Sequence, residues 1–331
     1  MMNYEIFKEV VAEKFKSYLP EQYQGMELRV ASVNKVNRLM DGITLVDNSA
    51  EKHISPTIYI NDMYEHYLHT ENLQEVLQDA ARSMDNAFMQ APDAGILNFD
   101  NAKDNIVFQL VNTLQNEDML RDMPHREFQD LSIIYRWVVD VDERGVQSSV
   151  VRNNLAEQLG MNEEQLFKSA VENTRRLLPP VVKSMNDVIR SMFISDGMPP
   201  EVADMMIDEV PQDRMMYIIS NEQGINGAGS MLYEDNLYKL AMELETDLYI
   251  LPSSVHECIA VSVNAGDPYE LAEMVSEINM SQVALEERLS NQVYHYDKDA
   301  RRLTLATDTP NKRLDGMVAE AQLIYDSGKS R

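Results

Sequence analysis

Cysteine and tryptophan are nearly absent from this chain, which has one of each among its 331 residues. With Cys258 alone, no disulfide can form within the chain and no cluster of thiolates can hold a metal. Cys258 stands between apolar residues of a predicted strand, so we expect an inert buried thiol rather than a nucleophile. Long apolar runs are also missing, and none approaches the roughly 18 residues of a membrane span. The amphipathic pattern of residues 1–19 differs from a signal peptide. We therefore expect a cytoplasmic protein without a membrane partner.

Basic side chains are scarce: 29 lysines and arginines stand against 55 acidic residues, which gives a formal net charge of -26. A field of this sign repels phosphate backbones, so direct binding of nucleic acid is disfavoured. The ordinary consequence of such acidity is solubility. The acid can also attract a basic protein partner or imitate nucleic acid. Acidic residues without any basic neighbour gather in two segments, 201–213 and 267–287.

The order of apolar patterns predicts an α+β fold, with mixed sheets packed against helices and a helical segment in the middle of the chain. Strands and helices alternate without a strict βαβ order, which argues against a doubly wound sheet. We expect an N-terminal α+β domain over residues 1–145 and a helical segment over 146–213. An α/β domain over 214–316 and a final segment, 317–331, with a frayed end complete the prediction.

Local signals place several turns and helix ends. Asp41-Gly42 predicts a turn between strands over 28–36 and 43–46. Asn162 with Gln165 predicts a capping box at a helix start. Apolar spacing after Pro179-Pro180 predicts another helix over 181–193.

The segment 252–257 carries the first group of candidate catalytic residues, Ser253, Ser254, His256 and Glu257. A serine nucleophile needs a neighbouring base, which in turn needs an orienting acid, and all three residue types occur here. On a strand, however, Ser254 and His256 face one side and Glu257 the other. The alternative is a proline-initiated turn whose hydroxyls satisfy backbone amides, with His256 partly buried. The third interpretation is a binding role, in which His256 and Glu257 contact a polar ligand or partner.

The loop 224–230 is a candidate anion site through Gly227, Gly229 and Ser230, since it is expected to lie between a strand and a helix. Glycines there would let the backbone approach a phosphate. The spacing matches neither the dinucleotide fingerprint nor the P-loop, and no lysine follows the glycines. Glu234 and Asp235 in the next helical turn would repel a phosphate. A plain connecting turn is the alternative, and we predict no cofactor.

The residues Asp62, His66 and His69 share one face of a predicted helix and are weak candidates for a metal site. The helix is expected to end near Thr70, and the zinc motif His-Glu-x-x-His is missing. Solvated histidines beside neighbouring tyrosines are the alternative, so we predict no metal.

Several short motifs along the chain resemble those of one protein family. They are Val33-Asn34-Lys35-Val36-Asn37, Ser55-Pro56-Thr57-Ile58-Tyr59, Tyr233-Glu234-Asp235-Asn236-Leu237, Leu251-Pro252-Ser253-Ser254-Val255-His256-Glu257 and Glu287-Arg288-Leu289-Ser290-Asn291-Gln292-Val293-Tyr294. Together they resemble a family of uncharacterised proteins from gut Firmicutes that carries only a domain-of-unknown-function label. The resemblance covers nearly the whole chain and implies a bacterial cytosolic protein of this length. It implies no activity and no site residues.

The leading functional hypothesis is a soluble acidic protein that acts by binding another protein. It predicts a large surface patch that is apolar or of a single charge sign. The first alternative is a hydrolase with its pocket between residues 224–230 and 252–257. The second is a nucleic-acid mimic that inhibits a DNA-binding protein, which predicts salt-sensitive capture of a basic partner.

Overall fold

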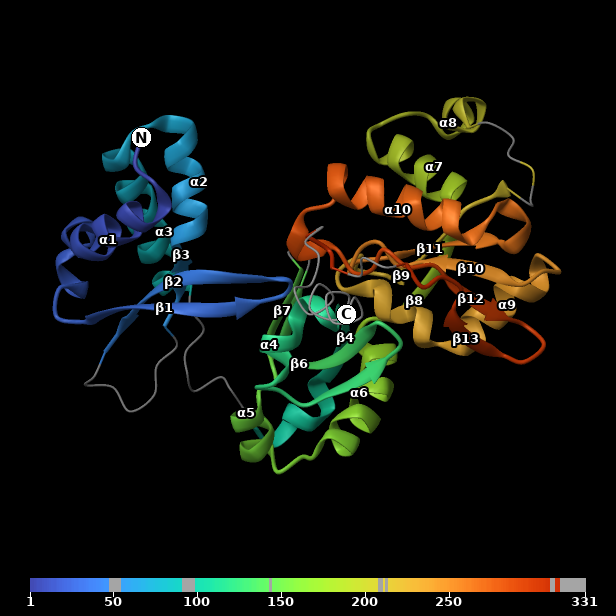
Figure 1. The fold of residues 1–331 in the computed structure, drawn as a ribbon, viewed down its shortest axis with the longest axis horizontal. Helices are drawn as coiled ribbons and strands as arrows, with labels where there is room; N and C mark the ends of the chain where they lie inside the picture. Colours follow the sequence, from blue (N-terminus) through green and yellow to red (C-terminus); the bar gives the residue numbers. More distant parts are fainter. Residues whose placement is uncertain are drawn as a thin grey trace, which may run out of the picture. The chain divides into compact units, whose positions relative to one another are not determined.

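Two compact units make up the chain, Met1–Asn98 and Phe99–Arg331. The computed structural model describes residues 1–47, 55–90, 99–142, 145–207, 211, 214–309 and 313–315. Helices and antiparallel sheets occur in both units, which confirms the predicted α+β fold class (Figure 1). Each unit encloses hydrophobic core residues of its own.

Unit 1 packs helices against an antiparallel sheet of strand order β1-β2-β3. Helical spacing buries Phe7 and Val11 of the first helix and Leu77 and Met84 of the last, together with Ile43 of the sheet. The elements are α1 (Tyr4–Lys14), η1 (Phe15–Tyr18), η2 (Glu21–Tyr23), β1 (Glu27–Lys35), β2 (Arg38–Val46), β3 (Thr57–Tyr59), α2 (Ile60–Thr70) and α3 (Leu73–Gln90).

The turn predicted at Asp41-Gly42 is wrong, because both residues lie inside β2. The chain turns at Val36-Asn37, where Asn37 adopts a left-handed φ of 64° that asparagine tolerates. Gly42 is instead explained by β3, since a Cβ at this position would lie 2.7 Å from Thr57 Cγ2. The glycine therefore permits close approach of neighbouring side chains within the sheet.

Unit 2 begins with a sheet of order β4-β6-β5, in which β7 also pairs with the long β6. All residues of β4 are buried, and the helix α6 packs against this strand. The capping box at Asn162 and Gln165 is confirmed at the start of α6. The elements are η4 (Phe99–Asn105), β4 (Ile106–Asn112), η5 (Leu114–Asn116), α4 (Glu117–Leu120), β5 (His125–Phe128), β6 (Leu131–Asp142), β7 (Gly145–Val150), α5 (Asn153–Leu159) and α6 (Glu163–Leu177).

The second sheet of unit 2 has the order β13-β12-β10-β11-β9-β8, with antiparallel neighbours throughout. In Figure 1, α10 covers one face of this sheet and α9 lies on the other. The elements are β8 (Pro180–Ser184), α7 (Met185–Ser195), α8 (Pro200–Met206), β9 (Tyr217–Asn221), η7 (Gly227–Leu232), α9 (Glu234–Glu243), β10 (Leu248–Leu251), β11 (Cys258–Ser262), η8 (Val263–Ala265), α10 (Pro268–Gln282), η9 (Leu285–Glu287), β12 (Tyr294–Asp297) and β13 (Arg302–Leu305).

The uninterrupted helix predicted over residues 181–193 is wrong at its start. Residues 180–184 form the edge strand β8, which pairs with β9, and the helix α7 begins only at Met185. Two β-branched residues, Val181 and Val182, suit the strand. The Ser184 hydroxyl then accepts the backbone N–H of Asp187 at 3.0 Å and caps the helix.

The domain boundaries predicted after residues 145, 213 and 316 stay predictions. Residue 145 lies in the hairpin of β6 and β7, and residues 317–331 lie outside the described part of the chain. Among the described residues, no helix is at once long and apolar enough to cross a bilayer.

Candidate functional sites

The structure brings the loop 224–230 and the segment 252–257 together, because both follow strands of the six-stranded sheet. The backbone N–H of Ala228 donates to the Val255 carbonyl at 3.2 Å, and the Ser220 hydroxyl donates to the His256 carbonyl at 2.7 Å. Predicted hydrolase residues therefore do lie side by side with the predicted anion loop. Whether these residues could catalyse hydrolysis depends on the hydrogen-bond partners of the His256 imidazole.

His256 is oriented by two partners, and neither is a serine. Its Nδ1 accepts the backbone N–H of Asn226 at 3.2 Å, and its Nε2 lies 3.7 Å from a carboxylate oxygen of Glu287. The Ser254 hydroxyl accepts the backbone N–H of His256 at 3.0 Å, as a turn hydroxyl does. Because the imidazole nitrogens face Asn226 and Glu287, the ring is not placed as a base for a serine nucleophile.

The other two residues of this group, Ser253 and Glu257, lie apart from the imidazole contacts. Ser253 accepts the backbone N–H of Leu289 through its carbonyl at 2.8 Å, and it lines a cavity on the α10 side of the sheet. Among the described contacts, none joins the Glu257 carboxylate to His256. The acid near the imidazole is Glu287, from a segment 31 residues away in the sequence (287 − 256).

The glycines of the loop pack against protein atoms. A Cβ on Gly227 would lie 2.7 Å from the His256 carbonyl oxygen, and one on Gly229 would lie 2.6 Å from Cε2 of Phe108. Both glycines and Ser230 are buried within η7. The missing side chains thus allow the loop to contact β4, β9 and the segment 252–257, which leaves the backbone of Gly227 and Gly229 no room to cradle a phosphate.

The three candidate metal ligands of unit 1 do not converge. His69 Nδ1 donates to the Glu65 carbonyl at 2.7 Å. His66 instead meets Glu75 and Asp79 of α3, with one ligand atom from each residue within 4.8 Å of the others. Both carboxylates already have partners, since Asp79 pairs with Arg82 and Glu75 accepts from Asn72 Nδ2 at 3.1 Å. We assign no metal to this group.

A larger feature of unit 2 is an apolar groove between the sheet and α10, with a volume of about 720 Å³. Its floor is formed by side chains of β10 and β11, and its wall by α10. Two wall residues, Met274 and Ile278, are exposed to solvent by 44% and 43%. The lining residues are Arg214, Met216, Leu251, Ser253, Ile259, Val261, Asn264, Ala265, Leu271, Met274, Val275 and Ile278.

Exposed methionines extend beyond the groove onto α7 and α8. The helix α7 buries none of its residues, and Met192 is 61% exposed. Met205 and Met206 of α8 are exposed as well. In Figure 1 both helices lie on the same side of the sheet as α10. No sequence pattern predicted a role for these exposed methionines, although the amphipathic spacing of residues 271–278 predicts the helix that forms the groove wall.

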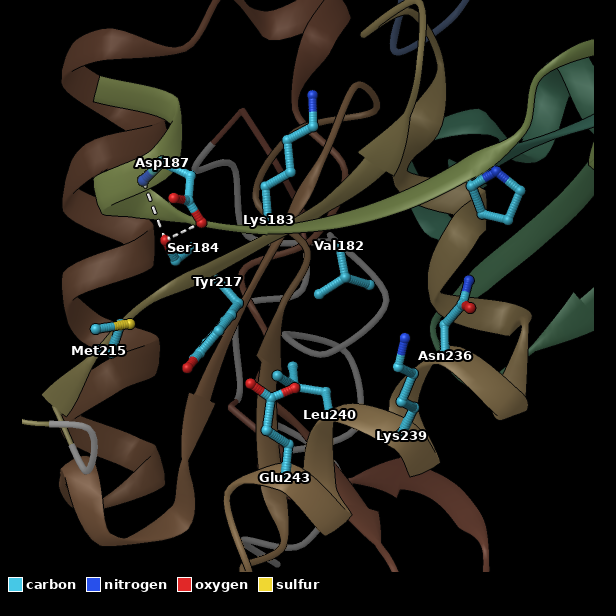
Figure 2. Close-up of a pocket in the computed structure, with 11 residues that line it drawn as sticks. Val182, Lys183, Ser184, Asp187, Met215, Tyr217, Asn236, Lys239, Leu240 and Glu243 are labelled. Atoms are coloured by element: carbon cyan, nitrogen blue, oxygen red, sulfur yellow. Dashed lines mark hydrogen bonds between the residues drawn. The ribbon is translucent and has the colours of Figure 1, made fainter. Parts of the chain in front are cut away.

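A polar pocket of about 530 Å³ lies on the α9 side of the sheet, between this helix, the edge strand β8 and its neighbour β9. Val182, Tyr217 and Leu240 contribute its less polar surface, and Figure 2 shows Val182 pointing toward α9 while Lys183 points away. In this view Asn236 and Lys239 lie to the right of Leu240, and Glu243 lies to its left, on the side of the Tyr217 hydroxyl. Burial raises the pKa of Tyr217, and the Glu243 and Asp187 carboxylates raise it further.

Comparison with known proteins assigns a family and no activity. No curated protein and no solved structure is significantly similar to the chain. Residues 4–298 match the family of unknown function DUF5688. This match spans most of the sequence and includes elements of both units, so the chain belongs to the family of unknown function DUF5688.

Proposed function

We propose that this chain acts by binding another protein, and that the apolar groove receives an amphipathic helix with basic flanks. The observation that carries the proposal is the groove itself, where apolar side chains of β10, β11 and α10 surround about 720 Å³ and remain open to solvent. An amphipathic helix docks by placing its apolar face into a groove of this kind.

Methionine suits such a surface because its side chain is unbranched, flexible and polarisable. Met216 and Met274 line the groove, and both are exposed by 44%. The methionines of α7 and α8 extend the same chemistry over neighbouring helices. Apolar side chains exposed in such number on one side of a domain are typical of interaction surfaces.

Charge favours a basic partner over an acidic one. On α10, the exposed residues Glu270, Glu273 and Glu277 form a stripe beside the groove wall, because their spacing of three and four places them on one helical face. The net charge of -26 adds a long-range attraction for basic surfaces. Arg214, at the groove lining, is the one arginine or lysine among the described lining residues.

The test uses two synthetic helical peptides with the same amphipathic pattern, one of leucine and lysine and one of leucine and glutamate. Fluorescence anisotropy with the full chain should show saturable binding of the lysine peptide, weakening as salt is added. Met274→Glu should reduce the affinity by about tenfold, because it puts a charge into the apolar contact.

Met242→Glu is the matched control, since Met242 is also exposed and lies on α9, on the opposite side of the sheet. Both variants add one negative charge, so general attraction to the lysine peptide changes equally. Equal binding of the two peptides, or wild-type affinity in Met274→Glu, would refute the proposal.

The two alternatives stay hypotheses without a specific contact in their favour. A hydrolase would need a hydroxyl at the His256 imidazole, where Asn226 and Glu287 lie instead. A nucleic-acid mimic would need carboxylates at phosphate-like spacing, and several acids in the described residues are paired with arginines.

A further inference from the structure

The polar pocket of Figure 2 contains charged and polar groups without partners. The Nδ2 atom of Asn236 is buried and has no hydrogen-bond partner. Within the described part of the chain, Lys239 and Glu243 take part in no ion pair. A buried donor without an acceptor costs free energy, and an acceptor atom from outside the chain, of a water or of a ligand, would remove this cost.

The polar residues of the pocket lie on one face of α9. Asn236, Lys239, Leu240 and Glu243 are spaced at i, i+3, i+4 and i+7, so they face the same side of the helix. Lys239 and Glu243 are four positions apart, which is about 6 Å along the helix axis. A small molecule in the pocket would therefore meet a cation and an amide donor at one end and a carboxylate at the other.

The opposed charges of α9 select the class of ligand. Of the two other charged lining residues, Asp187 accepts from the Ser184 hydroxyl at 2.6 Å and Lys183 points away from α9. A simple anion would suit Lys239 and Asn236 but would leave Glu243 facing like charge, and a simple cation would face Lys239 in the same way. A molecule with both an ammonium and a carboxylate satisfies both ends. Its zero net charge also spares it the repulsion that a net charge of -26 imposes on anions.

We propose that this pocket binds a small zwitterion, either an α-amino acid or a dipeptide. The ligand carboxylate accepts from Lys239 Nζ and Asn236 Nδ2, and its ammonium donates to the Glu243 carboxylate. The Tyr217 hydroxyl lies at the ammonium end, and Val182 and Leu240 contact the apolar part of the ligand. The pocket volume of about 530 Å³ falls within the range of small-molecule sites. This site is separate from the apolar groove and does not depend on the proposed function.

The test is isothermal titration calorimetry of the full chain with the common L-amino acids and with alanine and glycine dipeptides. For each probe that binds, the N-acetyl derivative removes the ammonium and the C-terminal amide removes the carboxylate. Each derivative should bind at least about tenfold more weakly than its parent. Whether the parent is an amino acid or a dipeptide identifies the source of the zwitterion.

Variants assign each end of the ligand. In Lys239→Met the parent should bind at least about tenfold more weakly, and the further loss from amidation should largely disappear. In Glu243→Gln the same should hold for acetylation. Lys168→Met and Glu172→Gln are matched controls, because this lysine and glutamate are exposed at the same i, i+4 spacing on α6, outside the pocket. Circular dichroism confirms that all variants are folded.

Three results would overturn the proposal. The first is no saturable binding of any amino acid or dipeptide tested. The second is an acetylated or amidated derivative that binds as well as its parent. The third is a wild-type affinity in Lys239→Met or Glu243→Gln. The calorimetry is independent of the peptide experiment on the apolar groove, so either proposal can fail without the other.

Discussion

At the scale of single residues, Gly229 shows how a missing side chain sets the packing of unit 2. It is buried in η7, against the ring of Phe108 in β4. Gly229→Ala places a methyl group 2.6 Å from Phe108 Cε2, which forces the ring or the loop to move. We expect the free energy of unfolding to fall by about 1–3 kcal/mol, as overpacking does. Chemical denaturation monitored by circular dichroism measures the change.

Gly25→Ala serves as the control, because no atom lies within 4 Å of a Cβ at that exposed position. We expect this variant to keep the wild-type stability or to gain slightly through a less flexible unfolded chain. Equal stability of Gly229→Ala and the wild type would contradict the packing explanation of the loop.

The sequence identified several residues at this scale but not their partners. The group around His256 does lie beside the glycine loop, as the hydrolase hypothesis requires. The imidazole, however, meets Glu287 and a backbone amide. Glu287 could not be found from the local pattern, because its approach depends on how residues 283–293 return to the sheet. In the polar pocket, the spacing of Lys239 and Glu243 is visible in the sequence, and a strand is expected before the loop 224–230. The strand β8 is not visible, because a helix was predicted over its residues.

At the scale of elements, α6 is fixed to its sheet by the first residue of the helix. The Arg126 guanidinium donates twice to the Glu163 carboxylate, at 3.0 and 2.9 Å, and the buried Tyr135 hydroxyl also donates to it. Burial alone would raise the pKa of Glu163, but the hydrogen bonds from Arg126 and Tyr135 outweigh it and lower the pKa. The helix start therefore depends on an ionised carboxylate.

Replacing this carboxylate should change both stability and its pH dependence. We expect Glu163→Gln to lower the free energy of unfolding at neutral pH by about 1–3 kcal/mol, because two donors lose a charged acceptor. A lowered carboxyl pKa stabilises the fold above the pKa of the unfolded chain, about 4.3. This contribution is lost as the pH falls through the lowered folded-state pKa. The deficit of Glu163→Gln should thus shrink below pH ~4 in urea titrations at several pH values.

Glu157→Gln is the matched control in the neighbouring helix α5, where the carboxylate is exposed. Its stability should follow the wild type at every pH. A Glu163→Gln deficit that stays constant from neutral pH to pH ~3 would show that the ionised carboxylate is not what fixes the helix.

Elements were predictable where a local signal marks them and unpredictable where a distant strand decides. The capping box at Asn162 and Gln165 has its partners within one helical turn, so the start of α6 could be predicted. β8 forms because it pairs with β9, and the register places Pro180 opposite Asn221, which lies 41 residues later in the sequence (221 − 180). Likewise, Asp41-Gly42 has the composition of a turn, but β1 pairs with both residues inside β2, and β3 pairs with Gly42 from the other side.

At the scale of the whole molecule, unit 1 has a hydrophobic core of its own. Residues from all of its helices and from its sheet form this core. Fully buried members include Phe7, Phe15, Ile43, Ile60 and Leu77. A chain of about 100 residues with such a core is long enough to fold alone. We expect residues 1–98, produced separately, to unfold cooperatively on heating and to give dispersed amide signals in NMR spectra.

Residues 99–331 provide the matching fragment, and it should retain the affinity of the apolar groove for the leucine and lysine peptide. A fragment 1–98 with the spectrum of an unfolded chain would show that the core of unit 1 requires the rest of the protein. The sequence patterns predicted a globular α+β protein, but they contain no signal for this division. The first unit ends at Asn98, inside the N-terminal domain expected over residues 1–145.

The burial of Cys258 has a practical consequence. Its Sγ lies 3.6 Å from the Ala228 carbonyl oxygen and from Met231 Sδ, and burial, with a smaller effect of Glu257, raises the pKa of the thiol. A thiol that is both enclosed and protonated reacts slowly with maleimides. One engineered surface cysteine in each unit would therefore react with dyes or spin labels while the Cys258 thiol stays unlabelled. Distances between the units could then be measured by energy transfer in an otherwise native chain.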